Sequence, residues 1–141
     1  MVELSCHCGA AKLELAQAPR KLTACNCSLC RRYGALWAYF PARAVRFLSA
    51  ARAIEYYSSG DRVLRFGRCR KCGCIMHWTQ RKPRDAYNRM GVNMRNVDDP
   101  TAVAKLPIRM LDGAGAWKVL YARAQPALFG SPVRKRTKAR A

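Results

Sequence analysis

The chain has 141 residues and a formal net charge of +19, since 27 lysines and arginines outnumber 8 aspartates and glutamates. This length fits one domain of ordinary size with a short tail, and a half-apolar composition excludes a disordered or fibrous chain. No apolar run approaches the ~20 residues of a membrane-spanning helix, and Cys6 precedes any apolar stretch that a secretory signal needs. We therefore expect a cytoplasmic protein that does not enter a membrane. Its charge suits a nucleic acid, an anionic small molecule or simply an arginine-rich surface.

In chain order, apolar residues alternate with polar ones or form short runs bounded by Gly, Pro, Asn or Ser, a pattern typical of β-strands. Nine such strands are predicted, at 11–15, 22–25, 35–40, 45–48, 54–57, 63–66, 75–78, 88–92 and 117–121. Two short helical turns are predicted, at 27–33 and at 100–106, where a proline stands at the start. The sequence therefore predicts a mostly β fold with little helix.

The composition changes near the C-terminus, where five lysines and arginines fall within positions 134–140 and no large apolar residue accompanies them. Such a segment does not bury enough apolar surface to fold. We expect a domain at 1–125 and a flexible basic tail at 126–141, which is either a solvated terminus or an anchor for a polyanion.

Eight cysteines form three clusters: Cys6-His7-Cys8, Cys25-Asn26-Cys27-Ser28-Leu29-Cys30 and Cys69-Arg70-Lys71-Cys72-Gly73-Cys74. A reducing cytosol keeps cysteines as thiols, so metal binding explains the clusters better than disulfides do. Thiolates converge on one zinc ion from tight turns, and Gly9 and Gly73 directly follow a cysteine, where a glycine lets the chain curl around the metal.

A structural zinc takes four ligands and a catalytic zinc takes three, with the fourth position open. The first and third clusters supply four ligands for a closed site: Cys6, Cys8, Cys69 and Cys72. This leaves three cysteines for an open site: Cys25, Cys27 and Cys30. The spacing equally permits two four-cysteine sites, with Cys74 completing the second, and Cys74 is otherwise a buried free thiol.

These motifs, together with Val92-Asn93 before Asp98, resemble the glutathione-dependent formaldehyde-activating enzyme family, also called the CENP-V/GFA domain, over about residues 2–122. The resemblance implies an Mss4-like, zinc-binding, β-rich fold with two zinc sites per chain. It assigns Cys6, Cys8, Cys69 and Cys72 to the structural zinc, and Cys25, Cys27 and Cys30 to the zinc at which the chemistry occurs. Cys74 lies outside the matching positions.

The resemblance implies an S-(hydroxymethyl)glutathione synthase, a carbon–sulfur lyase that joins the thiolate of glutathione to formaldehyde or a similar small aldehyde. Glutathione carries two carboxylates, and Arg31 and Arg32, directly after the second cluster, suit bidentate carboxylate binding or are solvated surface residues. One alternative is a zinc-stabilised basic module that binds nucleic acid or another polyanion without catalysis. Another is a glutathione-binding protein without turnover.

Other residues near the clusters have two interpretations. Trp37, Tyr39 and Phe40 form an apolar wall beside the second cluster or pack in the core. His77 is expected as a packed core residue rather than a catalytic base. Asn93 and Asp98 match the family motif, and polar capping of a turn explains them equally well.

Overall fold

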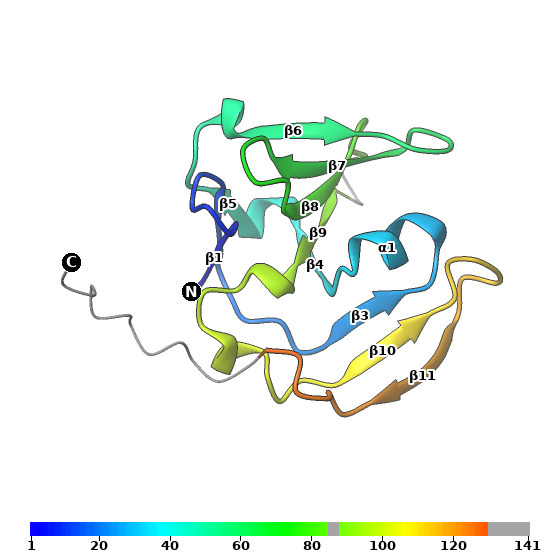
Figure 1. Ribbon diagram of the computed structural model, residues 1–141. Helices are drawn as coiled ribbons and strands as arrows, with labels where there is room; N and C mark the ends of the chain where they lie inside the picture. The colour runs from blue at the N-terminus through cyan, green and yellow to red at the C-terminus, as the bar shows by residue number, and fades with distance from the viewer. Residues whose placement is uncertain (85–87, 130–141) are drawn as a thin grey trace.

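The predicted alternating segments form two β-sheets (Figure 1). The computed structural model describes residues 1–84 and 88–129. Within these residues there are eleven strands and one α-helix, which confirms the mostly β fold. The strands are β1 Val2–Ser5, β2 Lys12–Leu15, β3 Leu22–Cys25, β4 Trp37–Pro41, β5 Val45–Phe47, β6 Ile54–Tyr57, β7 Leu64–Cys69, β8 Ile75–Gln80, β9 Arg89–Asn93, β10 Ile108–Leu111 and β11 Val119–Arg123. The helix is α1 Ser28–Tyr33, and short 3-10 turns occur at Ala42–Ala44, Ala51–Ala53, Met94–Asn96 and Pro100–Ala102.

A small sheet has the strand order β1-β2-β5, and a large sheet has the order β11-β10-β3-β4-β9-β8-β7-β6. All strand pairs are antiparallel except β3 and β10, which run parallel and pair Thr23 with Arg109 and Cys25 with Leu111. The C-terminal hairpin of β10 and β11 therefore lies beside β3 (Figure 1). This pairing determines what surrounds the second cysteine cluster.

The two faces of β4 contribute to different apolar clusters. Ala38 and Phe40 join the main core, which includes Leu4, Leu13 and other residues of the small sheet. Trp37, on the opposite face, belongs to a second cluster that includes Phe66 and partly buried side chains of α1. Because side chains alternate along a strand, one strand connects the core to the face covered by α1.

The nine predicted strands are all present, with ends shifted by a few residues, but β1 and β10 were not predicted. β1 directly precedes the first cysteine cluster, and Pro107 directly precedes β10. The first predicted helical turn is α1, and the second begins as the 3-10 turn Pro100–Ala102. Most of the predicted tail, 126–141, lies outside the described residues, and the domain boundary remains a prediction.

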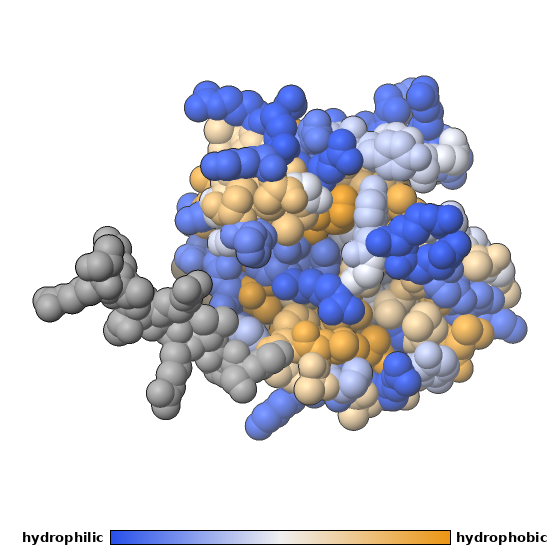
Figure 2. Space-filling model, in the orientation of Figure 1, coloured by the Kyte–Doolittle hydropathy of each residue, from blue (hydrophilic) through white to orange (hydrophobic). Residues whose placement is uncertain are grey.

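No helix in the described part of the chain is long and apolar enough to cross a membrane. Figure 2 shows hydrophilic side chains over much of one face, mainly around β6 and α1. Apolar surface gathers below them, over β10 and β11 (Figure 2). Exposed lysines and arginines occur throughout the described part of the chain, from Lys12 to Arg123, so the positive charge is not confined to the tail.

Candidate functional site

Four thiols from two distant turns converge on one point. Their sulfur atoms all lie within 4.8 Å of one another: Cys6, Cys8, Cys69 and Cys72. Cys8 Sγ lies 3.5 Å from Cys6 Sγ and 3.6 Å from Cys69 Sγ. Sulfur atoms around one tetrahedral zinc lie ~3.8 Å apart, because each Zn–S bond is ~2.3 Å long. The four side chains therefore fit one metal ion of this kind.

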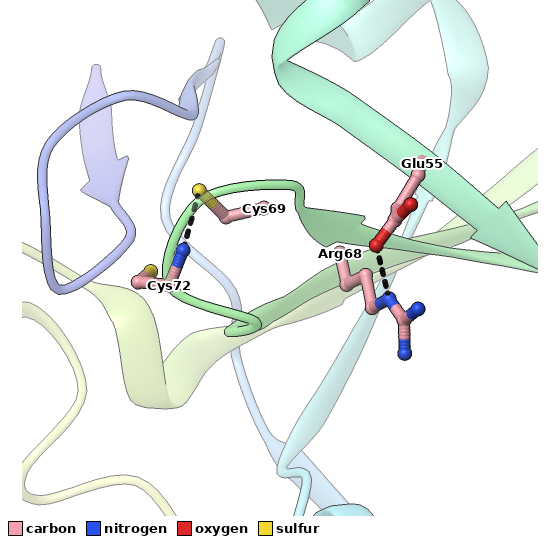
Figure 3. Close-up of polar contacts among 4 residues, drawn as sticks. All are labelled: Glu55, Arg68, Cys69 and Cys72. Atoms are coloured by element: carbon pink, nitrogen blue, oxygen red, sulfur yellow. Dashed lines mark hydrogen bonds and ion pairs between the residues drawn. The ribbon is translucent and has the colours of Figure 1, made fainter.

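The two turns that carry these thiols have similar backbone conformations. Gly9 and Gly73 have φ values of 80° and 79°, in the left-handed region that favours glycine. Backbone N–H groups point at the sulfur atoms: Ala11 donates to Cys6 Sγ over 3.2 Å, and Cys72 donates to Cys69 Sγ over 3.5 Å (Figure 3). The expected curl around a metal is present in both turns.

Backbone N–H groups favour the ionised form of two of these thiols, Cys69 and Cys72. The N–H of Cys74 is the main group that lowers the pKa of Cys72, to about 5. Burial opposes ionisation of Cys69, but the N–H groups of Cys72 and Lys71 lower its pKa overall. The N–H of Ala10 acts in the same direction on Cys8, but burial and the thiols of Cys6, Cys69 and Cys72 raise the pKa of Cys8 to about 11. The thiolate is the form that binds a metal, so the backbone prepares Cys69 and Cys72 for binding.

Cys74 ends the second of these turns but is not part of the four-thiol group. Its carbonyl oxygen accepts a hydrogen bond from the N–H of Cys69 over 2.9 Å, and its side chain packs against the main core. The structure therefore places Cys74 beside the four-thiol group and not with Cys25, Cys27 and Cys30. Of the two interpretations of Cys74, its position agrees with a partly buried free thiol.

Three thiols form the second group, where β3 ends and α1 begins. Their sulfur atoms also lie within 4.8 Å of one another: Cys25, Cys27 and Cys30. Within the residues that the structure describes, no further His, Cys, Asp or Glu side chain joins them. Cys27 caps α1, because its Sγ accepts the N–H of Cys30 over 3.3 Å. Three donors leave one position of a tetrahedral ion for another ligand.

The environment of this second group differs from thiol to thiol. Burial raises the pKa values of Cys25 and Cys30. Burial acts in the same direction on Cys27, but the N–H of Cys30 and the neighbouring thiols lower the pKa of Cys27 overall. The indole Nε1 of Trp37, which is almost completely buried, donates to Cys30 Sγ over 3.3 Å. Trp37 thus contacts the thiol group directly as well as packing in the core.

A loop between β10 and β11 covers one side of the three thiols. Asn26, between two of the cysteines, donates to Asp112 Oδ1 over 2.9 Å and accepts the N–H of Ala114 over 2.9 Å. A Cβ atom on Gly113 would lie 2.4 Å from Cys25 Sγ and 3.3 Å from the ring of Trp117. The loop backbone therefore approaches the thiols more closely than any residue but glycine allows.

A family model described as glutathione-dependent formaldehyde-activating enzyme matches residues 1–107 of this chain, a range that contains all seven of these cysteines. The chain belongs to this family. Its structure is also similar to the crystal structure of a Rhodobacter sphaeroides protein determined as a structural genomics target, with a TM-score of 0.60 and 29% sequence identity. The similarity covers 75% of this chain and 98% of the other.

In this member of the glutathione-dependent formaldehyde-activating family, the hairpin that covers the thiols lies beyond the family match, since β10 begins at Ile108. No pattern in the sequence marks Arg109, Asp112, Gly113 or Trp117 as site residues. The dipeptide Asp112-Gly113 is a turn signal that predicts a loop here. Nothing in it indicates that the loop returns to a cysteine cluster 86 positions earlier.

The predicted arginines and histidine of this family member have contrasting surroundings. Arg31 and Arg32 are exposed on α1, and Arg32 donates to the carbonyl oxygen of Ser28 over 2.7 Å. His77 is fully buried, as expected, and its Nε2 lies 3.3 Å from the Tyr56 hydroxyl. Its ring packs edge-on against Phe47 of the small sheet.

The two motif residues after the third cluster connect segments of the fold. Buried Asn93 accepts the N–H of Leu36 over 3.1 Å and donates to the carbonyl oxygen of Ile75 over 2.9 Å. Asp98 accepts the Ser5 hydroxyl over 2.9 Å. These contacts agree with the interpretation that Asn93 and Asp98 stabilise turns.

Proposed function

We propose that this protein is an S-(hydroxymethyl)glutathione synthase of the carbon–sulfur lyase class, which joins glutathione to formaldehyde or a similar small aldehyde. The observation that carries the proposal is the unequal division of the cysteines into a group of four and a group of three. The group of four is complete as a structural zinc site. The group of three has room for the thiol of a substrate.

In this proposal Cys25, Cys27 and Cys30 hold a zinc ion, and Cys6, Cys8, Cys69 and Cys72 hold another. Thiolate donors suit zinc, and backbone N–H groups favour the ionised forms of Cys27, Cys69 and Cys72. A zinc ion bound to three thiolates supplies a site at which a further thiol has a lowered pKa and is a thiolate at neutral pH.

The chain's own residues then orient the substrate and limit water. Trp37 holds Cys30 through its indole N–H, and the loop that contains Gly113 covers the side of Cys25. Arg31 and Arg32 are proposed to bind glutathione carboxylates. In the reaction the sulfur–carbon bond forms, the carbonyl π bond opens, and the proton of the thiol ends on the former carbonyl oxygen.

Because glutathione is a reducing cosubstrate and all eight cysteines are free, we place the activity in a reducing compartment such as the cytoplasm.

The test compares adduct formation from glutathione and formaldehyde with the spontaneous rate. We expect two zinc ions per chain and acceleration by the natural protein. Cys27→Ser is expected to lose the acceleration, whereas Cys74→Ser, which removes a thiol outside both groups, is expected to keep it. A protein that holds two zinc ions and leaves the spontaneous rate unchanged would contradict the proposal.

A further inference from the structure

A positively charged pocket lies on the same face of the large sheet as the three thiols. It has a volume of about 460 Å³, and the residues that matter for its chemistry are Arg20, Lys21, Thr23, Tyr39, Arg89 and Arg109. Four of these side chains are cations, and no acidic residue among those described lines the pocket. A pocket with this composition suits an anion.

The strand register places this pocket next to the thiols. Thr23 precedes Cys25 by two residues on β3, and side chains two residues apart lie on the same face of a strand. Thr23 also pairs with Trp37 on β4, whose indole bonds Cys30, and with Arg109 on β10. Two residues along a strand span ~7 Å, which is less than the ~10 Å of an extended tripeptide.

Arg109 is held in position at the inner side of the pocket. Its Nε donates to Thr23 Oγ1 over 2.8 Å, and its Cζ lies 5.8 Å from the centre of the Tyr39 ring. The ion pairs among the described residues join Arg46 to Glu14 and Arg68 to Glu55, so Arg109 has no carboxylate partner there. Since only Nε is used, the two terminal nitrogens remain to bind a carboxylate in the bidentate manner of arginine.

Tyr39 joins the pocket to the thiol group. Burial raises the pKa of its phenol, and this is opposed by a hydrogen bond with Thr23 and by the charge of Arg109. The thiols of Cys25 and Cys30 act on the same phenol. Tyr39 lies two residues after Trp37 on β4, and therefore on the face of the strand from which Trp37 donates to Cys30.

We propose that Arg109 binds a carboxylate of the thiol substrate while the substrate's sulfur is at Cys25, Cys27 and Cys30. This inference rests on the proposed function and adds a residue outside the family match. Arg109 is a substrate-binding residue that selects thiols with a carboxylate over uncharged thiols. Arg89, an exposed residue of the same pocket, adds to the positive potential without contacting Thr23.

The experiment measures KM for glutathione and for 2-mercaptoethanol, which has no carboxylate, with formaldehyde as the common substrate. Losing a hydrogen bond between charged groups weakens binding ~10-fold to 100-fold. We expect Arg109→Gln to raise KM for glutathione by this factor, to leave KM for 2-mercaptoethanol unchanged, and Arg109→Lys to restore part of the difference. The matched control is Arg123→Gln, which removes a charge from the exposed strand β11 of the same hairpin. Equal effects on both thiols, or no effect, would overturn the inference.

A binding measurement separates this inference from the proposed function. S-methylglutathione has both carboxylates and no free thiol, so its Kd for the natural protein reports the carboxylate contacts without turnover. We expect Arg109→Gln to weaken the binding of S-methylglutathione ~10-fold or more. The inference is overturned if the variant binds S-methylglutathione as tightly as the natural protein does, or if the natural protein does not bind it. If Arg109→Gln does not fold, Arg89→Gln is decisive, and a Kd equal to that of the natural protein counts against the pocket. Failure of the protein to accelerate adduct formation with any thiol overturns the proposed function alone.

Discussion

Trp37 and Cys30 are joined by an N–H···S hydrogen bond of 3.3 Å, which ties the aromatic face of β4 to the three-thiol group. The same indole is buried against Phe66, with ring centroids 6.2 Å apart. The thiol that α1 presents is therefore fixed by a side chain of the central sheet. Because the N–H stabilises the ionised sulfur, Trp37 supports the three-thiol group as well as packing in the core.

Trp37→Phe removes this donor and keeps an aromatic ring. Removing a hydrogen-bond partner of a metal ligand typically weakens metal binding ~10-fold to 100-fold, and we expect a loss in that range at the three-thiol site. Competition with a chromophoric chelator measures it. Trp78→Phe is the matched control, because Trp78 packs on Tyr39 and has no hydrogen bond to a sulfur among the described contacts. Equal losses of metal affinity in both variants would mean that the indole N–H of Trp37 does not contribute to metal binding.

Cys69→Ser and Cys27→Ser are expected to differ in stability. Cys69 is completely buried in the group that joins the N-terminal turn to the β7–β8 turn, so its loss should destabilise the fold. We expect about 3 kcal/mol, or a decrease in Tm of roughly 10 °C. Cys27→Ser should change Tm by much less, since its group joins neighbouring residues at one helix end. Thermal unfolding with zinc analysis tests both, and a larger loss in Cys27→Ser would reverse the roles of the two groups.

Gly113→Ala introduces a methyl group where Cys25 Sγ lies only 2.4 Å away. Either the loop or the thiol must move, so we expect weaker metal binding at the three-thiol site, by about 10-fold, with unchanged circular dichroism. Ala114→Ser also adds one heavy atom, at the exposed neighbouring position, and is the control. If Gly113→Ala binds metal as tightly as the natural protein, the loop does not constrain the site.

His77 is expected to make stability depend on pH. Burial is the main cause that lowers its pKa from 6.5 to about 4, with a smaller contribution from Arg65. The unfolded chain therefore binds the proton more readily between pH 6.5 and about 4, so this contribution is complete above pH 6.5 and decreases as the pH falls. The full loss is about 3 kcal/mol.

Urea unfolding at several pH values, compared between the natural protein and His77→Gln, isolates the contribution of His77 to the free energy of unfolding. Thiol protonation affects both proteins equally. The variant should have a shallower pH dependence between pH 4 and 6.5. Parallel curves would show that His77 titrates alike in the folded and unfolded chains.

The sequence was sufficient to predict those features that depend on neighbouring residues. Cys-x-Cys and Cys-x-x-Cys spacing with Gly9 and Gly73 predicts the tight turns that bring the thiols together, because their geometry is local. Alternation predicts nine strands, including β4, whose two faces serve different clusters. The burial of His77 was also expected, since it stands between Met76 and Trp78 in an apolar segment.

Contacts between distant segments were not predictable in this way. Nothing in the sequence around Asn26 indicates its hydrogen bond to Asp112. Likewise, nothing around Arg109 indicates its hydrogen bond to Thr23. Both contacts depend on the parallel pairing of β3 with β10, which no local pattern encodes. The same is true of Asn93, whose partners Leu36 and Ile75 come from two other segments.

The parallel pairing of β3 with β10 also affects the order in which the chain acquires its parts during synthesis. Thr23 and Arg109 are 86 positions apart, as are Asn26 and Asp112. When the ribosome has made Cys25, Cys27 and Cys30, the loop that covers them does not yet exist. The three thiols are therefore open to metal before this loop is made, and the covering hairpin closes over them only after β10 and β11 have emerged.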